Sequence, residues 1–265
     1  MKKCMKYAVM LMASAGVGTT LTAGTVAYWN MQDAVPGTLA KSGSMVKTSV
    51  NAPDLNAKVF ADANTSTEFS SDIPGKIIVA GKDAKVVNGD NKSSFRMICK
   101  GGNRPGLTVA GSKLLNLDTF TIEAFIKADK LAKWGGIMAK LRAKGNYTWQ
   151  LQNLDDSGKI RARVDSNPLD AKSKSGFNQG FNTSMVVADG KWHHIAITYD
   201  ALTQMFSIYG DYKLLVSRKT SLPVIYDNNP LTMLGGAGSG PAELAMDEVR
   251  ISDKVLPVED FLKVK

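Results

Sequence analysis

Residues 191–200, KWHHIAITYD, alternate between two sides with a period of two along their whole length. The preceding Asp189-Gly190 pair is typical of turns, so a strand should begin directly after it. The alternation divides the stretch into two sets, Trp192, His194, Ala196 and Thr198 against His193, Ile195, Ile197 and Tyr199. Because both sets contain apolar bulk, the stretch predicts a strand inside a two-layer β-sandwich.

His193 and His194 are the only histidines of the chain. A pair of adjacent histidines suggests a metal or catalytic site. However, neighbouring residues of a strand point to opposite faces, so the two rings cannot easily meet at one ion. We therefore expect structural roles for both.

Most of the remaining chain also has the character of strands and turns. Further strand-like segments lie at residues 25–31, 76–80, 84–87, 94–100, 119–129, 137–142, 147–154, 159–165, 204–209, 212–217, 231–234 and 244–252. No long segment shows the helical period, and residues 257–262 suit a single helical turn that begins with proline. The sequence predicts an all-β chain in one domain.

The first 23 residues have the composition of a secretory signal. Lys2, Lys3 and Lys6 precede a run without charge, which is apolar at residues 8–12 and then rich in small residues. An uncleaved membrane anchor is the alternative, but its Gly/Thr-rich second half suits a spanning helix poorly. We expect cleavage after Ala23, with Ala15 and Ala27 as the alternative sites. Export to the periplasm, cell surface or medium would follow, with no stable membrane insertion afterwards.

Removal of this signal changes both the charge and the cysteine count. The formal charge of +9 falls by three to +6, which still favours anionic partners. Cys99 remains as the single cysteine, so no intrachain disulfide can form. The apolar content of 44% is enough for a sizeable core, and stability must come from that core or from a bound metal.

Four segments resemble the laminin-G-like, concanavalin A-like lectin/glucanase family in its usual order. They are VAYWNM, FTIEAFIKAD, KWHHIAITYD and MDEVRISDKVLPVEDF, which begin at residues 26, 120, 191 and 246. The resemblance implies a jelly-roll of two packed antiparallel sheets over residues 24–265, and it is weak between Asp33 and Ser94. In such a fold Phe120 and Trp192 are expected in the layer between the sheets.

The resemblance also implies a structural calcium ion at the rim of the sandwich. The family places it between the end of the first strand and the closing strand, where Asp33 and Asp247 are the matching carboxylates. The alternative is that Asp33 caps a turn and that Asp247 pairs with an arginine or lysine.

Catalysis is not expected. Hydrolases of this fold present the pattern Glu-x-Asp-x-x-Glu, which does not occur here. Asp247 and Glu248 are adjacent, so on a regular strand they would face opposite ways, and Glu123 has no carboxylate two residues away.

Two predicted strands carry basic residues at alternate positions. Lys140, Arg142 and Lys144 share one side of the first, and Lys159, Arg161 and Arg163 share one side of the second. If both strands lie in one sheet, Lys140, Arg142, Lys144, Arg161 and Arg163 form a basic ligand-binding patch. The alternative is a solvated outer face.

These observations predict an exported, non-catalytic binding or adhesion module. Carbohydrate, and an anionic glycan in particular, is the favoured ligand, because an exported protein rarely meets nucleic acid. Two alternatives are a structural surface protein that binds other proteins and a glycan hydrolase with an unrecognised site.

Overall fold

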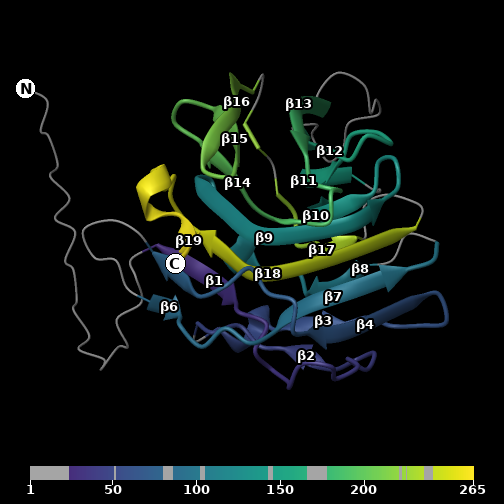
Figure 1. The fold of residues 1–265 in the computed structure, drawn as a ribbon. Coiled ribbons are helices and arrows are strands. Elements are labelled where there is room, and N and C mark those ends of the chain that lie inside the picture. Colours follow the sequence, from purple (N-terminus) through teal and green to yellow (C-terminus); the bar gives the residue numbers. More distant parts are fainter. Residues whose placement is uncertain are drawn as a thin grey trace, which may run out of the picture.

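The computed structural model describes residues 24–50, 52–79, 86–101, 105–142, 146–165, 178–220, 223–224, 226–235 and 241–265. The expected export signal at residues 1–23 lies outside these described residues. Within them, two eight-stranded antiparallel sheets face each other, which confirms the predicted two-sheet architecture. In Figure 1 the hydrogen-bonded neighbours of each sheet are stacked one below another, from the top of the view to the bottom.

The first sheet has the order β16-β15-β14-β9-β18-β7-β4, and β1 also pairs with β18. Its strands are β1 (Thr25–Trp29), β4 (Thr65–Ser70), β7 (Ser94–Cys99), β9 (Phe120–Leu131), β14 (Trp192–Asp200), β15 (Met205–Gly210), β16 (Lys213–Lys219) and β18 (Ala242–Ser252). The strand predicted at residues 191–200 is β14, and it pairs with β9 without a shift in register.

The second sheet has the order β13-β12-β11-β10-β17-β8-β3-β2. Its strands are β2 (Met45–Val46), β3 (Ala57–Val59), β8 (Pro105–Val109), β10 (Gly136–Arg142), β11 (Asn146–Asn153), β12 (Lys159–Asp165), β13 (Asn178–Val186) and β17 (Leu231–Gly235).

Smaller elements close the ends of the sandwich. A three-stranded sheet joins β5 (Ile77–Val79), β6 (Val86–Asn88) and the C-terminal β19 (Leu262–Val264). Short 3-10 turns lie at η1 (Pro53–Leu55), η2 (Lys113–Leu115) and η4 (Val258–Asp260), and η4 is the single helical turn predicted near the C-terminus. The described residues contain no helix that is long and apolar enough to span a membrane.

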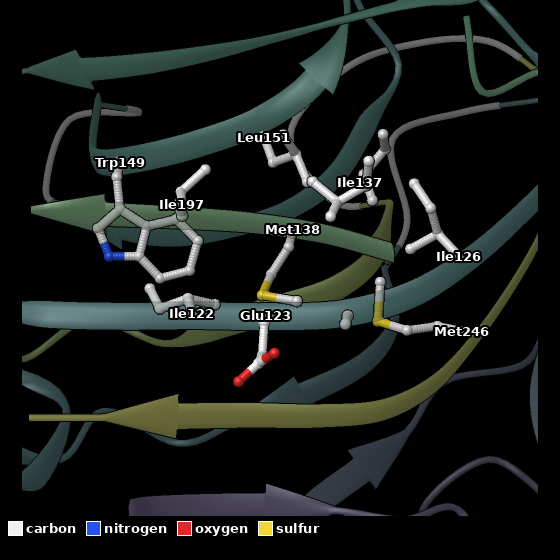
Figure 2. Close-up of a pocket in the computed structure, with 11 residues that line it drawn as sticks. Ile122, Glu123, Ile126, Ile137, Met138, Trp149, Leu151, Ile197 and Met246 are labelled. Carbon is white, nitrogen blue, oxygen red and sulfur yellow. The ribbon is translucent and has the colours of Figure 1, made fainter. Parts of the chain in front are cut away.

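Apolar side chains of both sheets fill the layer between them. Ile195, Ile197 and Tyr199 of β14 lie there, on one side of the strand as predicted. Phe120 lies there too, with its ring centroid 6.3 Å from that of Trp149 and 5.7 Å from that of Tyr199. Figure 2 shows side chains that meet in the middle of the layer, Ile122, Ile126, Ile197 and Met246 from the first sheet and Ile137, Met138, Trp149 and Leu151 from the second.

The position of Trp192 differs from the expectation. Trp192 is half-buried on the outer side of the first sheet, and its Nε1 donates to Asp72 Oδ1 at 2.8 Å. It packs against a small separate cluster, formed by Tyr28, Ile77, Phe125 and Leu262. The expectation that Trp192 fills the central layer was wrong, because the C-terminal segment supplies apolar cover on the other side of the strand.

Glu123 of β9 organises this outer side. It is 1% exposed, and its carboxylate points away from the apolar layer (Figure 2). Arg250 Nε donates to Oε1 at 2.7 Å, His194 Nε2 lies 2.8 Å from Oε2, and the backbone N–H of Leu262 donates to Oε2 at 2.8 Å. Burial acts to raise the pKa of Glu123, but the hydrogen bond with His194 and the charge of Arg250 lower it below the ordinary value. The ionised carboxylate therefore attaches the C-terminal segment to the first sheet.

The two histidines point to opposite sides of β14, as predicted, and each contacts carboxylates. His194 is 2% exposed and stacks on Tyr212 at a centroid distance of 4.7 Å. His193 lies 2.9 Å from Asp211 through Nδ1 and 3.0 Å from Asp189 through Nε2. His193 thus ties the turn between β15 and β16 to the loop before β14.

Replacing the buried carboxylate should destabilise the whole domain. Glu123→Gln keeps the shape but leaves Arg250 as an uncompensated buried charge, so we expect a loss of about 3–5 kcal/mol in the free energy of unfolding. Urea unfolding would measure it. The matched control is Glu68→Gln, which breaks a half-exposed pair with Arg96 at 3.0 Å and should cost no more than about 1 kcal/mol. Equal losses in both variants would contradict the anchoring role of Glu123.

Candidate functional site

A β-bulge in β18 brings two consecutive carboxyl groups against one turn. The pairing of β18 with β9 shifts between Asp247 and Arg250, and Glu248 adopts a left-handed φ of 53°. Asn91 Nδ2 donates to Asp247 Oδ2 at 2.7 Å, and Asn88 Nδ2 donates to Glu248 Oε1 at 2.5 Å. The expectation that these two acidic side chains diverge was wrong, because the left-handed residue interrupts the alternation of the strand.

Both carboxyl groups are completely buried, at 0% exposure. Tyr28 Oη donates to Glu248, and the backbone N–H of Glu248 donates to Asp247 Oδ1 at 2.9 Å. No cationic side chain among the described residues pairs with either group, so Asp247 lacks the basic partner considered above. Burial raises the pKa of Asp247 to about 8 and that of Glu248 to about 9. At neutral pH each group holds a proton unless a bound cation replaces it.

The hydrogen bonds of Asp33 involve a different part of the chain from those of this carboxyl pair. It is exposed, and both carboxylate oxygens accept from the backbone N–H of Lys47 at 3.1 Å. Lys47 is 14 residues further along the chain, so this contact joins two segments and is not the local turn cap considered as the alternative. Gln32, the neighbour of Asp33, reaches the pair instead, because Gln32 Nε2 donates to Asn91 Oδ1 at 2.7 Å and Asn91 binds Asp247.

Polar groups surround Asp247 and Glu248. The surrounding polar groups are the Tyr28 hydroxyl, the side-chain amides of Asn88 and Asn91, and the Gly75 carbonyl, which accepts from Asn91 at 3.1 Å. Carboxylate, amide and backbone oxygens are the ligands that calcium prefers. The described residues contain no group of three His, Cys, Asp or Glu side chains suited to a metal, so amide or backbone oxygens would have to complete such a site.

The second candidate region is the predicted basic face of the second sheet. The structure buries some of its predicted residues and places others on the outer side. Lys140 and Arg142 are 1% and 3% exposed, so the expectation that they form an exposed patch was wrong. Lys140 lies opposite Trp149 and Leu231, which are core residues, and its Nζ donates to the backbone carbonyls of Asp227 and Asn229. Register shifts in the pairing of β10 with β11 alter the alternation that had placed Lys140 outside. Lys144 lies outside the described residues.

Arg161 and Arg163 lie on the outer face of the second sheet, as predicted. Their neighbours Ala162 and Val164 belong to the core, so the arginines point the other way. In register, Arg163 lies between Gln150 and Gly180, and Arg161 lies between Gln152 and Asn182. Burial and then the positive charge of Arg163 lower the pKa of Arg161. An anion on this face would relieve that repulsion.

Aromatic rings accompany both arginines, and the sequence analysis did not anticipate them. The Arg161 guanidinium lies 5.2 Å from the ring centroid of Trp134, and the Arg163 guanidinium lies 5.2 Å from that of Tyr147. Trp134 is 42% exposed and has a left-handed φ of 60°, in the connection between β9 and β10. An exposed tryptophan and a half-buried tyrosine beside guanidinium groups suit sugar rings that carry acidic substituents.

Two donors on this face lack partners within the described part of the chain. Arg161 Nε and Gln152 Nε2 are both buried without a hydrogen bond, and their residues lie opposite each other in register. A buried donor without an acceptor costs about 1–3 kcal/mol. Gln152 is 1% exposed, so both donors lie beneath the surface of this face.

The geometry does not favour hydrolysis. Asp247, Glu248 and Glu123 are at most 1% exposed, and Glu123 is covered by the C-terminal segment. A general acid must come within hydrogen-bond reach of the glycosidic oxygen, which a sealed carboxyl group cannot do.

Comparison with known proteins agrees with the fold. A sequence profile of the concanavalin A-like lectin/glucanases superfamily matches residues 101–260, which is more than half of the chain. The chain therefore belongs to this family. No curated protein sequence matches it.

Solved structures with the same fold include several toxin domains. The binding domain of botulinum neurotoxin serotype D/C VPI 5993 is 14% identical with a TM-score of 0.53, over 89% of this chain and 50% of that one. The serotype D binding domain is 15% identical with a TM-score of 0.51, over 89% and 50%. Botulinum neurotoxin type C, whose passage into cells depends upon interaction with two ganglioside molecules, is 16% identical with a TM-score of 0.51, over 84% and 49%. The chain spans about half the length of these structures, and the likeness concerns the fold.

Without divalent cations, the stability of the domain should fall as the pH rises from 5 to 8. Asp247 and Glu248 have folded pKa values of about 8 and 9 against ordinary values of 3.8 and 4.5, so the folded state binds more protons across this range. Their contribution is complete below pH 4 and is lost as the pH rises through the folded values. Each group contributes a slope of up to about 1.4 kcal/mol per pH unit.

Urea unfolding in the presence of a chelator at several pH values would measure this slope. His193, whose pKa is raised by its two aspartates against the opposing effect of burial, adds a slope of the same sign near neutral pH. Comparison with Glu248→Gln isolates the carboxyl pair, because this variant keeps His193. Identical slopes in the wild type and in Glu248→Gln would show that Glu248 does not titrate in this range.

Proposed function

We propose that this protein is an exported, non-catalytic binding module that recognises acidic carbohydrate on the outer face of its second sheet. The observation that carries the proposal is the pairing of Trp134 with Arg161 and of Tyr147 with Arg163 on one face. Each pair combines an aromatic ring for a sugar with a guanidinium for a carboxylate or sulfate.

The charge of this face supports an acidic rather than a neutral sugar. Two guanidinium groups lie beside aromatic rings on it. Burial and then the charge of Arg163 lower the pKa of Arg161, so an anion nearby is favoured. The ganglioside dependence of the type C toxin belongs to a distant protein and serves here only as a precedent for glycan recognition by this fold.

Protein binding is a second candidate, and a different region favours it. Val35 and Leu39 are 75% and 69% exposed, and Met45 is 46% exposed. Leu39 and Met45 line a surface groove together with Asp33. Exposed apolar side chains around a groove are typical of protein interfaces, and this groove contains none of the arginines discussed above.

We also propose that Asp247 and Glu248 hold a structural calcium ion, with oxygens of the neighbouring turn completing its coordination. Two buried carboxyl groups without a basic partner within the described residues support this assignment, as do the nearby Tyr28 hydroxyl and Gly75 carbonyl. Asp33, the other carboxylate implied by the family resemblance, is not included, because its oxygens accept from Lys47. The ion would replace the two protons and join the bulge of β18 to the turn at residues 88–91.

Calcium should therefore raise the melting temperature. At 100 times its dissociation constant a ligand adds about 2.7 kcal/mol, which for a domain of this size is a shift of roughly 5–10 °C. The shift should be larger at pH 8 than at pH 6, because binding displaces protons. Thermal melts in calcium and in chelator would measure it. Glu248→Gln should remove the calcium-dependent shift and Asp33→Asn should leave it, whereas equal melting of the wild type in both buffers would exclude the ion.

Binding of acidic carbohydrate should depend on the two arginines. Arg161→Gln with Arg163→Gln should weaken the affinity for a uronic acid or sulfated polymer about 100-fold, since charge-assisted hydrogen bonds contribute about 1.5–3 kcal/mol each. Binding should also fall with salt, because screening shortens from about 8 Å to about 3 Å between 0.15 M and 1 M. Calorimetry on a soluble polymer would measure both effects.

The control for net charge is Lys113→Gln with Lys254→Gln, since both lysines are exposed and lie outside this face. Equal losses of affinity in both double variants would show that net charge alone attracts the polymer and that the face is not a specific site. If the protein binds a neutral glycan with an affinity that neither salt nor the arginine substitutions change, the binding site lies in another part of the protein.

A further inference from the structure

The two sheets meet at one edge of the sandwich in a groove that the proposed face does not include. β13 ends the second sheet and β16 ends the first, and these two edge strands lie side by side (Figure 1). The groove is lined by residues of both strands: Gln179, Gly180, Phe181, Arg218 and Lys219. Arg218 and Lys219 are exposed, and neither pairs with a carboxylate of the described residues.

The guanidinium of Arg218 is held in a fixed position. Its Nη2 donates to the backbone carbonyl of Gly180 at 2.9 Å, and its centre lies 4.9 Å from the ring centroid of Phe181. The Phe181 ring is in turn packed against Phe206, with 4.8 Å between centroids. An arginine that is ordered before binding loses little conformational freedom when it takes up an anion. Its fixed position and its lack of a carboxylate partner within the described residues suit Arg218 to binding an anion.

Gly180 connects this groove to the face that carries Arg161. A Cβ atom on Gly180 would lie 1.9 Å from Arg161 Nη2, so the absence of a side chain makes room for that guanidinium. The carbonyl of the same residue accepts from Arg218. Arg161 and Arg218 therefore contact one residue from two sides, and positive charge continues from the outer face around the edge of the sandwich.

We propose that the Arg218–Lys219 groove is a second anion subsite, which binds the next acidic group along a carbohydrate chain already held at Arg161. This inference rests on the proposed function and specifies its ligand class: an extended acidic polysaccharide bound along its length, with a carboxylate or sulfate at each of two subsites. A single acidic sugar would fill only the Arg161 subsite.

The test is a size series of uronic acid and sulfated oligosaccharides, from disaccharide to dodecasaccharide, titrated calorimetrically into the wild type and into Arg218→Gln with Lys219→Gln. The wild-type affinity should rise about tenfold or more with length and then level off. The variant should bind the disaccharide as the wild type does but lose that rise. Because both residues are exposed and only the Arg218 contacts with Gly180 and Phe181 are lost, its melting temperature should fall by no more than a few degrees.

The control variant is Lys41→Gln with Lys213→Gln, which removes the same charge from exposed positions outside the groove and places one change on β16 itself. It should keep the rise with length. If the groove variant still shows the full rise, or if both variants lose it equally, the second subsite is refuted while binding at Arg161 stands. If no acidic oligosaccharide of any length binds the wild type, the proposed function fails and the subsite fails with it.

Discussion

The buried carboxylate of Glu123 is the interaction on which the arrangement of this domain depends. It accepts from Arg250 and from the backbone of Leu262 and contacts His194, so β9, β18, β14 and the C-terminal segment meet at one side chain. Burying a charge is unfavourable unless nearly every lone pair is satisfied, and here a cation, an imidazole and a backbone N–H share the two oxygens. The cost of burial thus requires all four segments to be in place together, which makes closure of the first sheet cooperative.

This closure also makes the two outer faces of the sandwich different. Phe261 and Leu256 cluster with Ala196 of β14, and Phe261 lies 5.6 Å from His194 between ring centroids, so the C-terminal segment occupies the outer side of the first sheet. The outer side of the second sheet carries no such apolar cluster within the described residues, and it presents Arg161 and Arg163 instead. Two sheets built from similar alternating strands therefore differ within the described residues: the C-terminal segment covers the outer side of the first, whereas the second carries two arginines there.

The accuracy of the sequence analysis follows the regularity of the backbone. In β12 and β14 the alternation is unbroken, and Arg161, Arg163, Ile195 and Ile197 lie on the predicted sides. In β10 and β18, bulges change the register within a few residues, which turned Lys140 inward and brought Glu248 beside Asp247. A period-two pattern contains no information about such bulges, since an added residue reverses every side chain beyond it. The place of Trp134 beside Arg161 could not be predicted from the sequence either, because this contact depends on tertiary packing. The Gly135-Gly136 pair that follows Trp134 was the available signal of an exposed turn.

The carboxyl pair and the basic face present opposite electrostatic problems within one fold. Asp247 and Glu248 are buried acids without a cation among the described residues, and they avoid the cost of charge by holding protons or by binding an ion. Arg161 cannot lose its charge in this way, because guanidinium stays protonated at any physiological pH, so its charge persists beside that of Arg163. The acidic pair can therefore become neutral within the fold, whereas the arginine pair remains charged and attracts anions. That difference is the physical reason for proposing a structural role for the first and recognition for the second.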